Sequence, residues 1–170
     1  MKPIYKHALT FGLSLGITLS LFELLGYFLG IVIKPIMSLI YIAVVVSMLI
    51  IAIRKFRDQA EGGFLSFGNA FLVSFFTCLI AGAIWAVYRF AEYTLAPGII
   101  EETLLTLEEE FLKNNMSEDQ IESIMKLYTL FFTPAVVAVT TFVFNMGFGG
   151  AILSLIFAAI YKREKNPLTA

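Results

Sequence analysis

The chain has 170 residues, of which 59% are hydrophobic and 15% charged, and its formal net charge is −1. Soluble globular domains carry about 25% charged residues, so this composition excludes an ordinary soluble protein, and we expect no nucleic-acid partner. The single cysteine, Cys78, excludes a disulfide framework and a CxxC metal site.

Apolar stretches fill most of the chain, and each is long enough to cross hydrocarbon about 30 Å thick as a helix of about 20 residues. They lie at about 8–29, 35–53, 66–88 and 134–160. The first is long for a signal peptide, carries Glu23 and has no small-x-small cleavage site. We therefore predict an all-α integral membrane four-helix bundle, with one membrane domain over residues 1–170.

Basic residues gather at one set of ends of these stretches, and their distribution predicts the orientation. Lys2, Lys6, Arg54, Lys55, Arg57, Lys162, Arg163 and Lys165 share one side, whereas only Lys34, Arg89, Lys113 and Lys126 fall on the other. Positive residues in short flanks stay in the cytoplasm. Both termini are therefore expected in the cytoplasm, and the acidic segment before the fourth helix in the periplasm.

Small residues recur at spacing four in the first and third stretches. The two stripes are Ala8, Gly12, Gly16, Ser20 and Ala70, Ser74, Cys78, Gly82, Ala86. Membrane helices associate where small side chains let their backbones approach. We expect helix one to meet helix three along Gly12/Gly16 and Ser74/Cys78/Gly82; the alternative is that one stripe is reserved for a second subunit.

The fourth stretch contains clustered glycines in NMGFGGA, with Gly150 at spacing four from Ser154. A phosphate-binding loop also uses clustered glycines, but it follows a strand, and none is expected here. These glycines therefore indicate a close helix contact or a local kink.

The segment at about 97–130 predicts an amphipathic helical hairpin between the third and fourth membrane helices. Apolar residues recur at helical spacing from Ile100 to Phe111, with acids on the opposite face. Pro97 suits a first turn, Asn114 and Asn115 suit a helix end, and Ser117 with Gln120 forms a capping-box signal. Such short helices are marginal in water, so we expect the hairpin to cover the outer end of the bundle.

Three polar residues in or near the apolar stretches are candidates for a mechanism: Glu23, Asn145 and Arg89. A charge in hydrocarbon usually faces a partner or a wet cavity. Glu23 therefore has two interpretations: it handles protons or ions, or it makes a structural contact with Asn145 or Arg89. No set of residues for nucleophilic, nucleotide or paired-carboxylate chemistry can be assembled. We expect no enzyme, cofactor or metal.

Aromatic and basic residues meet at the predicted cytoplasmic end. Phe64, Phe67 and Phe71 lie on one face after the basic cluster Arg54, Lys55 and Arg57. The aromatic face suits anchoring in membrane lipids or docking of a partner's helix. The cations suit lipid phosphates or a polyprenyl phosphate equally well.

The stretches RKFRDQAEGGFLSFGNAF and MSEDQIE, with the positions of the four helices, resemble a family of small bacterial membrane proteins. That family is catalogued only as a domain of unknown function and is common in Bacteroidota. The resemblance implies a cell inner membrane location and supplies no catalytic residues. It also implies a possible partner, a polyprenol-phosphate glycosyltransferase.

Two functional hypotheses follow. The first is a non-enzymatic accessory or scaffold subunit of an inner-membrane complex, bound to another membrane protein or to itself as an oligomer. The second is a small transporter or flippase for an ionic or polyprenyl-phosphate-linked substrate that uses Glu23. A scaffold should have a dry core and an exposed apolar groove, whereas a transporter should gather several polar residues in one wet cavity.

Overall fold

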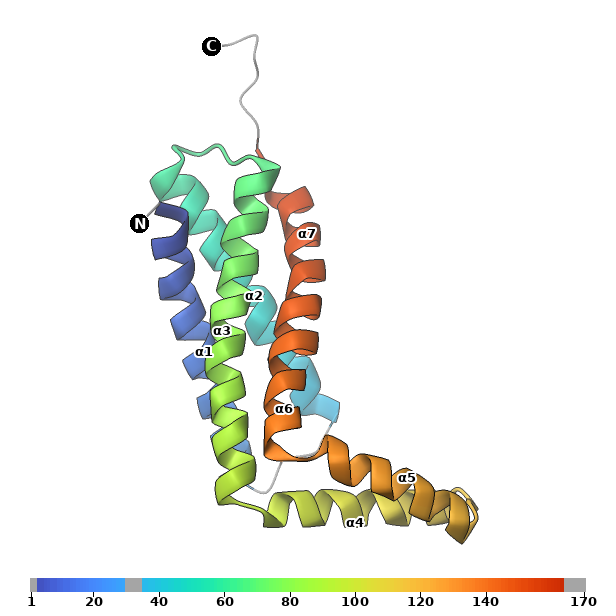
Figure 1. Cartoon of the computed structure of the whole chain (residues 1–170). Coiled ribbons are helices and arrows are strands. Elements are labelled where there is room, and N and C mark those ends of the chain that lie inside the picture. Colours follow the sequence, from blue (N-terminus) through green and yellow to red (C-terminus); the bar gives the residue numbers. More distant parts are fainter. Residues whose placement is uncertain (1–2, 30–34, 164–170) are drawn as a thin grey trace. The chain divides into compact units, whose positions relative to one another are not determined.

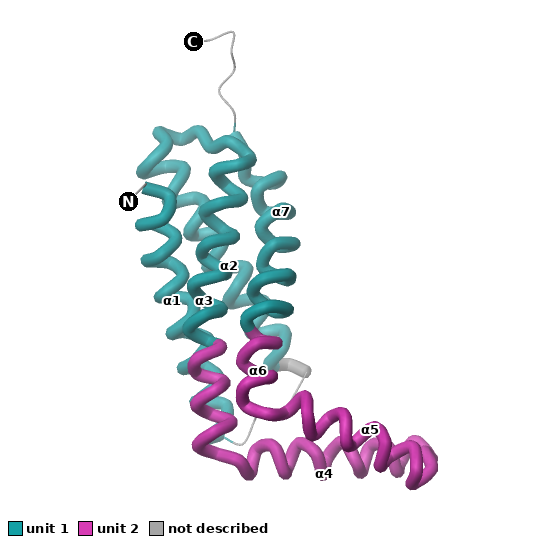
Figure 2. The backbone as a smooth tube through the Cα atoms, viewed as in Figure 1, with its two compact units in different colours: residues 1–85, 142–170 teal, residues 86–141 magenta. Residues whose placement is uncertain are grey.

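A computed structural model describes residues 3–29 and 35–163 (Figure 1). The elements are α1 (Pro3–Phe28), α2 (Pro35–Ala60), α3 (Phe67–Leu95), α4 (Gly98–Lys113), α5 (Glu118–Phe131), α6 (Pro134–Thr140), the π-helix η1 (Thr141–Gly149) and α7 (Gly150–Tyr161). The chain forms two compact units, shown in Figure 2. Unit 1 comprises residues 1–85 and 142–170, and unit 2 comprises residues 86–141.

The structure confirms the all-α class and the helices long and apolar enough to span a membrane. The candidate spans are Pro3–Phe28, Met37–Ala60, Phe67–Leu95 and Pro134–Tyr161. Three of these helices run beyond the predicted apolar stretches: α1 begins earlier, and α2 and α3 end later. A helix continues as long as its backbone hydrogen bonds do, and charged residues such as Arg54 and Lys55 are good helix formers. Hydropathy therefore predicts which residues lie in the hydrocarbon, but it does not predict where each helix begins or ends.

In unit 1, α1 packs against α3 at two glycines. A Cβ on Gly12 would lie 2.6 Å from Cβ of Ile80 and 3.0 Å from the carbonyl oxygen of Thr77. A Cβ on Gly16 would lie 2.8 Å from Cβ of Ile84. The two backbones are therefore as close as these side chains allow, as expected for small-residue contacts between membrane helices.

The prediction that helix one meets helix three at Gly12 and Gly16 is therefore confirmed, but Cys78 and Gly82 of the α3 stripe face the fourth spanning helix and not α1. A Cβ on Gly82 would clash with Met146, and a Cβ on Gly150 would lie 2.6 Å from Cβ of Cys78. Consecutive residues on a helix point about 100° apart. The face with Thr77 and Ile80 therefore contacts α1, while the adjacent face with Cys78 and Gly82 contacts the fourth helix.

The buried hydroxyl groups of unit 1 bond within their own helices. Ser74 donates to the carbonyl of Ala70 at 2.8 Å, Thr77 to that of Val73 at 2.7 Å, and Ser154 to that of Gly150 at 2.7 Å. Ser20, the last residue of the α1 stripe, donates to the carbonyl of Gly16 at 2.9 Å. These contacts satisfy hydroxyls that would otherwise be costly away from water.

Contacts between sequence-distant segments close the end of unit 1 that carries Pro3 and Arg163. Leu65 and Arg163 exchange two backbone hydrogen bonds of 2.8 Å, which tie the α2–α3 loop to the segment after α7. Nε2 of His7 lies 2.8 Å from the carbonyl oxygen of Ala52 and so joins α1 to α2.

Unit 2 contains the helices α4 and α5, which pack against each other. The rings of Phe111 and Tyr128 lie 6.0 Å apart between the two helices, and Ile121 is buried. The turn follows the sequence signals: Asn115 has a φ of 58°, and Oε1 of Gln120 accepts a 3.1 Å hydrogen bond from the backbone N–H of Ser117.

We expect Gly12→Ala to lower the stability of the purified protein, because the new Cβ meets Ile80 and a backbone oxygen that cannot move aside. The expected loss is about 1–3 kcal/mol. Gly26→Ala in the same helix is the matched control, because a Cβ there meets nothing within 4 Å. Unfolding in mixed micelles, followed by circular dichroism, measures both; equal stabilities would show that the glycine contact is not close.

Candidate functional site

Unit 1 has a groove between α2 and the fourth spanning helix, with a volume of about 470 Å³. We call it the lateral groove. One wall comes from α2, the other from η1 and α7, and Trp85 of α3 also lines it. Its lining residues are Ser38, Tyr41, Ile42, Val45, Trp85, Phe144, Asn145, Met146, Gly149, Gly150 and Leu153.

The π-helix η1 forms part of this wall. Its wide turns suit the glycines of the NMGFGG motif: a Cβ on Gly147 would lie 3.3 Å from the carbonyl oxygen of Phe142, and one on Gly149 would lie 3.4 Å from that of Phe144. Short π-helical segments inside α-helices frequently mark functional sites. The glycine cluster predicted either a close contact or a kink. The structure has the close contact at Gly150 and an irregular helix at η1.

Asn145 is exposed on the groove wall. The alternative that it pairs with Glu23 is wrong, because the Asn145 side chain makes no hydrogen bond with any residue that the structure describes. A helical wheel would not have shown this, because the π-helix changes the direction of the side chains that follow Thr141.

Glu23 is connected to the groove by a hydrogen bond with Trp85, one of the residues that line it. The indole Nε1–H of Trp85 donates to Oε2 of Glu23 at 2.5 Å, and the Trp85 ring lies 5.8 Å from the ring of Tyr41. Sequence reasoning missed Trp85 as a partner, because a tryptophan near the end of a span also fits an interfacial aromatic belt. Its indole donor, the only one in the chain, was the available signal.

Arg89 belongs to unit 2, and within this unit it contacts residues of its own helix. Its guanidinium contacts the Glu92 carboxylate at 2.8 Å and donates to the hydroxyl of Tyr93 at 3.1 Å. The hydroxyl of Tyr88 donates to the same carboxylate at 2.8 Å. This cluster spreads the Arg89 charge over several polar groups. A contact between Arg89 and Glu23 stays a prediction, since the two belong to different units.

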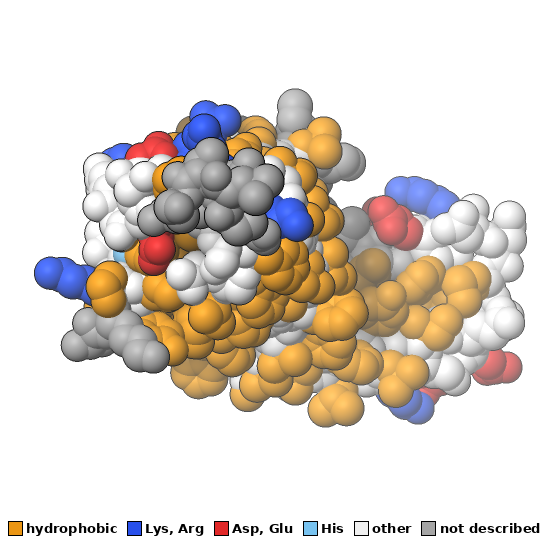
Figure 3. Space-filling view, turned by 90° about the horizontal axis from the view of Figure 1, so that it is seen from above, with side chains coloured by type: hydrophobic (Ala, Val, Ile, Leu, Met, Phe, Trp, Pro, Cys, Tyr) orange, Lys and Arg blue, Asp and Glu red, His pale blue; other side chains and the backbone are white. Residues whose placement is uncertain are grey.

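The basic cluster at the Pro3/Arg163 end contacts several different neighbours. Arg57 pairs with Asp58 at 2.7 Å, while Arg54 lies over the ring of Tyr161 and Lys55 over that of Phe11. These aromatic contacts partly cover the stems of Arg54 and Lys55. Figure 3, which looks onto this end, shows basic side chains there.

The three phenylalanines predicted beside this cluster differ in exposure. Phe64 is 37% and Phe67 39% exposed. Phe71 is half-buried and stacks on Phe75 with ring centroids 5.3 Å apart. Phe64 and Phe67 therefore offer the open aromatic surface at this end.

The candidate spans define a multi-pass membrane protein, and within the described residues no group of three or more His, Cys, Asp or Glu side chains could hold a metal. The chain belongs to the family described as a protein of unknown function (DUF4199), whose model matches residues 10–163. This confirms the resemblance to a family without an assigned function. No curated protein and no solved structure matches the chain.

We expect Glu23→Gln to leave the fold intact, because its side-chain carbonyl still accepts the Trp85 indole N–H and an expensive charge in the membrane is removed. Glu23→Leu removes the acceptor and should cost about 1–3 kcal/mol. Trp85 is the only tryptophan, so its fluorescence reports this contact directly. The emission maximum should move to shorter wavelength in Glu23→Leu; an unchanged spectrum and stability would exclude a structural role for this hydrogen bond.

Proposed function

We propose that the protein is a non-enzymatic accessory or scaffold subunit of a complex in the bacterial inner membrane, and that it acts through lateral contacts within the bilayer. The observation that carries this proposal is the lateral groove of unit 1 with the exposed Asn145 amide on its wall. Helices associate in lipid by close packing and by hydrogen bonds between polar side chains, and the groove offers both.

The chemistry of the groove supports a helix as its occupant. Most of its lining is hydrophobic, and its polar members are Ser38, Tyr41, Trp85 and Asn145. Gly149, which is half-buried in the wall, has no side chain that would hold another backbone away. A solute pathway would instead need polar groups arranged in series across the bilayer.

A transporter or flippase is the rival function, and it has less support. The buried hydroxyls Ser74, Thr77 and Ser154 donate to carbonyls of their own helices. Glu23 accepts a hydrogen bond from Trp85. Among the described residues these groups therefore have structural partners, which favours the scaffold.

The location and partner also belong to this proposal. The distribution of basic residues supports cytoplasmic termini and a periplasmic α4–α5 hairpin. Exposed Phe64 and Phe67 beside the basic cluster suit contact with lipid headgroups. A polyprenol-phosphate glycosyltransferase, suggested by the family resemblance, is one candidate partner for the groove.

A photoreactive phenylalanine analogue at Ile42 should form an adduct with a defined protein when it is activated in intact membranes. Ile42 lines the groove and is 57% exposed. The same analogue at Leu13, which is 42% exposed on α1 and does not line the groove, is the matched control. Mass spectrometry identifies the adducts; lipid adducts alone at both positions would contradict a scaffold that acts through this groove.

The proposed orientation predicts that an impermeant maleimide added to intact cells labels Glu110→Cys and spares Gln59→Cys. Both residues are exposed, and they lie in α4 and α2 respectively. Cys78 is fully buried, so it should not contribute to the signal. Permeabilised cells provide the control in which both variants react. The reverse pattern in intact cells would refute the orientation.

A further inference from the structure

We propose that the lateral groove is occupied by the fourth spanning helix of a second copy of this chain, in a two-fold dimer in which the two Asn145 side chains hydrogen-bond to each other. The inference rests on the proposed function, because it names the partner of the same groove. It assigns Asn145 the role of the central polar contact and Phe148 the role of an apolar anchor.

The first argument is the free amide of Asn145. Asn145 lies in the central part of the candidate span Pro134–Tyr161, is exposed, and its side chain has no hydrogen bond with the described residues. Hydrocarbon offers no water to satisfy such a group, and transfer of an amide without a partner costs several kcal/mol. Its stable state in a bilayer therefore has a donor and an acceptor from outside this copy.

The second argument is that a carboxamide is complementary to itself. It carries N–H donors and a carbonyl acceptor, so two copies can exchange two N–H···O bonds. A two-fold axis places the same residue of each chain opposite its counterpart, which is the geometry of an isologous interface. Asparagine pairs of this kind link membrane helices. A second copy supplies this partner at the correct depth, because both Asn145 side chains lie at the same height in the span.

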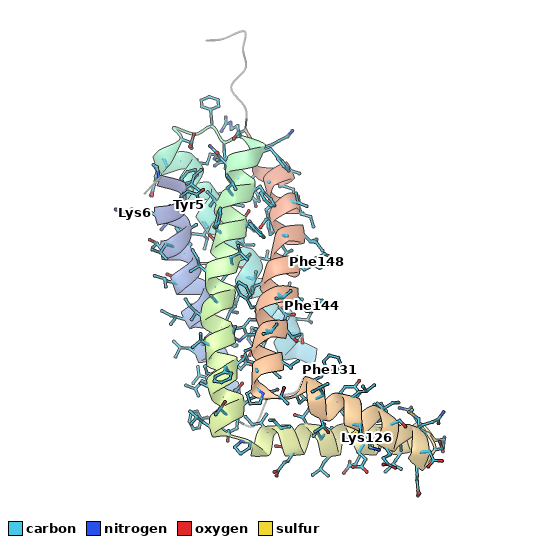
Figure 4. All side chains as sticks on the ribbon, in the orientation of Figure 1. Tyr5, Lys6, Lys126, Phe131, Phe144 and Phe148 are labelled. Carbon is cyan, nitrogen blue, oxygen red and sulfur yellow. The ribbon has the colours of Figure 1, made fainter. Side chains whose placement is uncertain are left out.

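The third argument is the apolar surface around Asn145. Phe144 is 64% and Phe148 67% exposed, and Figure 4 labels both on the fourth spanning helix. The groove lies beside them, with Phe144 and Asn145 in its wall. In a two-fold contact, the Phe148 ring of each copy can enter the groove of the other. Buried aromatic rings carry much of the free energy of such interfaces.

The test measures association of the full-length protein in liposomes by energy transfer between labelled copies, over a range of protein-to-lipid ratios. Wild-type protein should form a dimer. Asn145→Leu should raise the dissociation constant roughly tenfold, because two hydrogen bonds between helices are lost. Ser14→Leu is the matched control, since Ser14 is an exposed polar residue of α1 outside the groove, and it should associate as wild type does.

A second measurement keeps the inference testable if Asn145→Leu folds poorly. Trp85 lines the groove and is the only tryptophan, so brominated lipids should quench its fluorescence weakly in the dimer and more strongly when the groove is open. Phe148→Ala, which leaves Asn145 in place, should weaken association and increase quenching in the same direction. Circular dichroism establishes that each variant is folded.

The outcomes separate this inference from the proposed function. A wild-type protein that remains monomeric at every ratio, or a dimer that Asn145→Leu and Phe148→Ala leave unchanged, would overturn the two-fold contact. If the Ile42 photoadduct in that case contains a different protein, the scaffold function stands without the dimer. If the adduct contains only lipid, both proposals fail. An Ile42 adduct with the mass of two chains, lost in Asn145→Leu, supports both.

Discussion

The close approach of α3 to two neighbours is the contact on which the architecture of unit 1 depends. In lipid, burying apolar side chains gives helices little advantage, so they associate where their shapes fit. One face of α3 receives Gly12 and Gly16 of α1, and the adjacent face meets the fourth spanning helix at Gly82 and Gly150. These contacts hold α1 and the fourth helix on α3, and the lateral groove lies between that fourth helix and α2.

Most of the buried polar side chains of unit 1 have a hydrogen-bond partner within the described part of the unit, whereas Asn145 does not. Ser74, Thr77 and Ser154 are satisfied by their own helices, and Glu23 accepts the Trp85 indole N–H. Asn145 is exposed, and its side chain makes no hydrogen bond with the described residues. An exception of this kind in the centre of a membrane span costs free energy. Asn145 is therefore the position where a hydrogen bond from another molecule would recover this free energy.

Sequence reasoning succeeded where the physics is local. Apolar length located the spans, and turn chemistry at Asn115 and Ser117 located the hairpin. It also selected Glu23 and Asn145 as polar residues within apolar stretches. It correctly placed Gly12 and Gly16 of α1 against α3, but it assigned Cys78 and Gly82 to the wrong neighbour. Spacing four shows which residues share a face but not which helix that face meets.

The sequence pattern could not predict the lateral groove. It requires the separation of α2 from the fourth helix, the position of Trp85 and a π-helix over Thr141–Gly149. Each of these is decided by packing between segments far apart in the chain. A glycine cluster indicates only that the local backbone can depart from the α-helix.

The π-helix also determines the direction in which Asn145 points relative to α7, which belongs to the same unit. Removing one residue between Asn145 and Gly150 would turn Asn145 by about 100° around the helix axis relative to α7, while Gly150 could keep its contact with Cys78. The direction of Asn145 therefore depends on the length of this segment as well as on its side chains. Insertions and deletions here would redirect the surface offered to neighbours even where every substitution is tolerated, so segment length is the property through which related chains could acquire different neighbours.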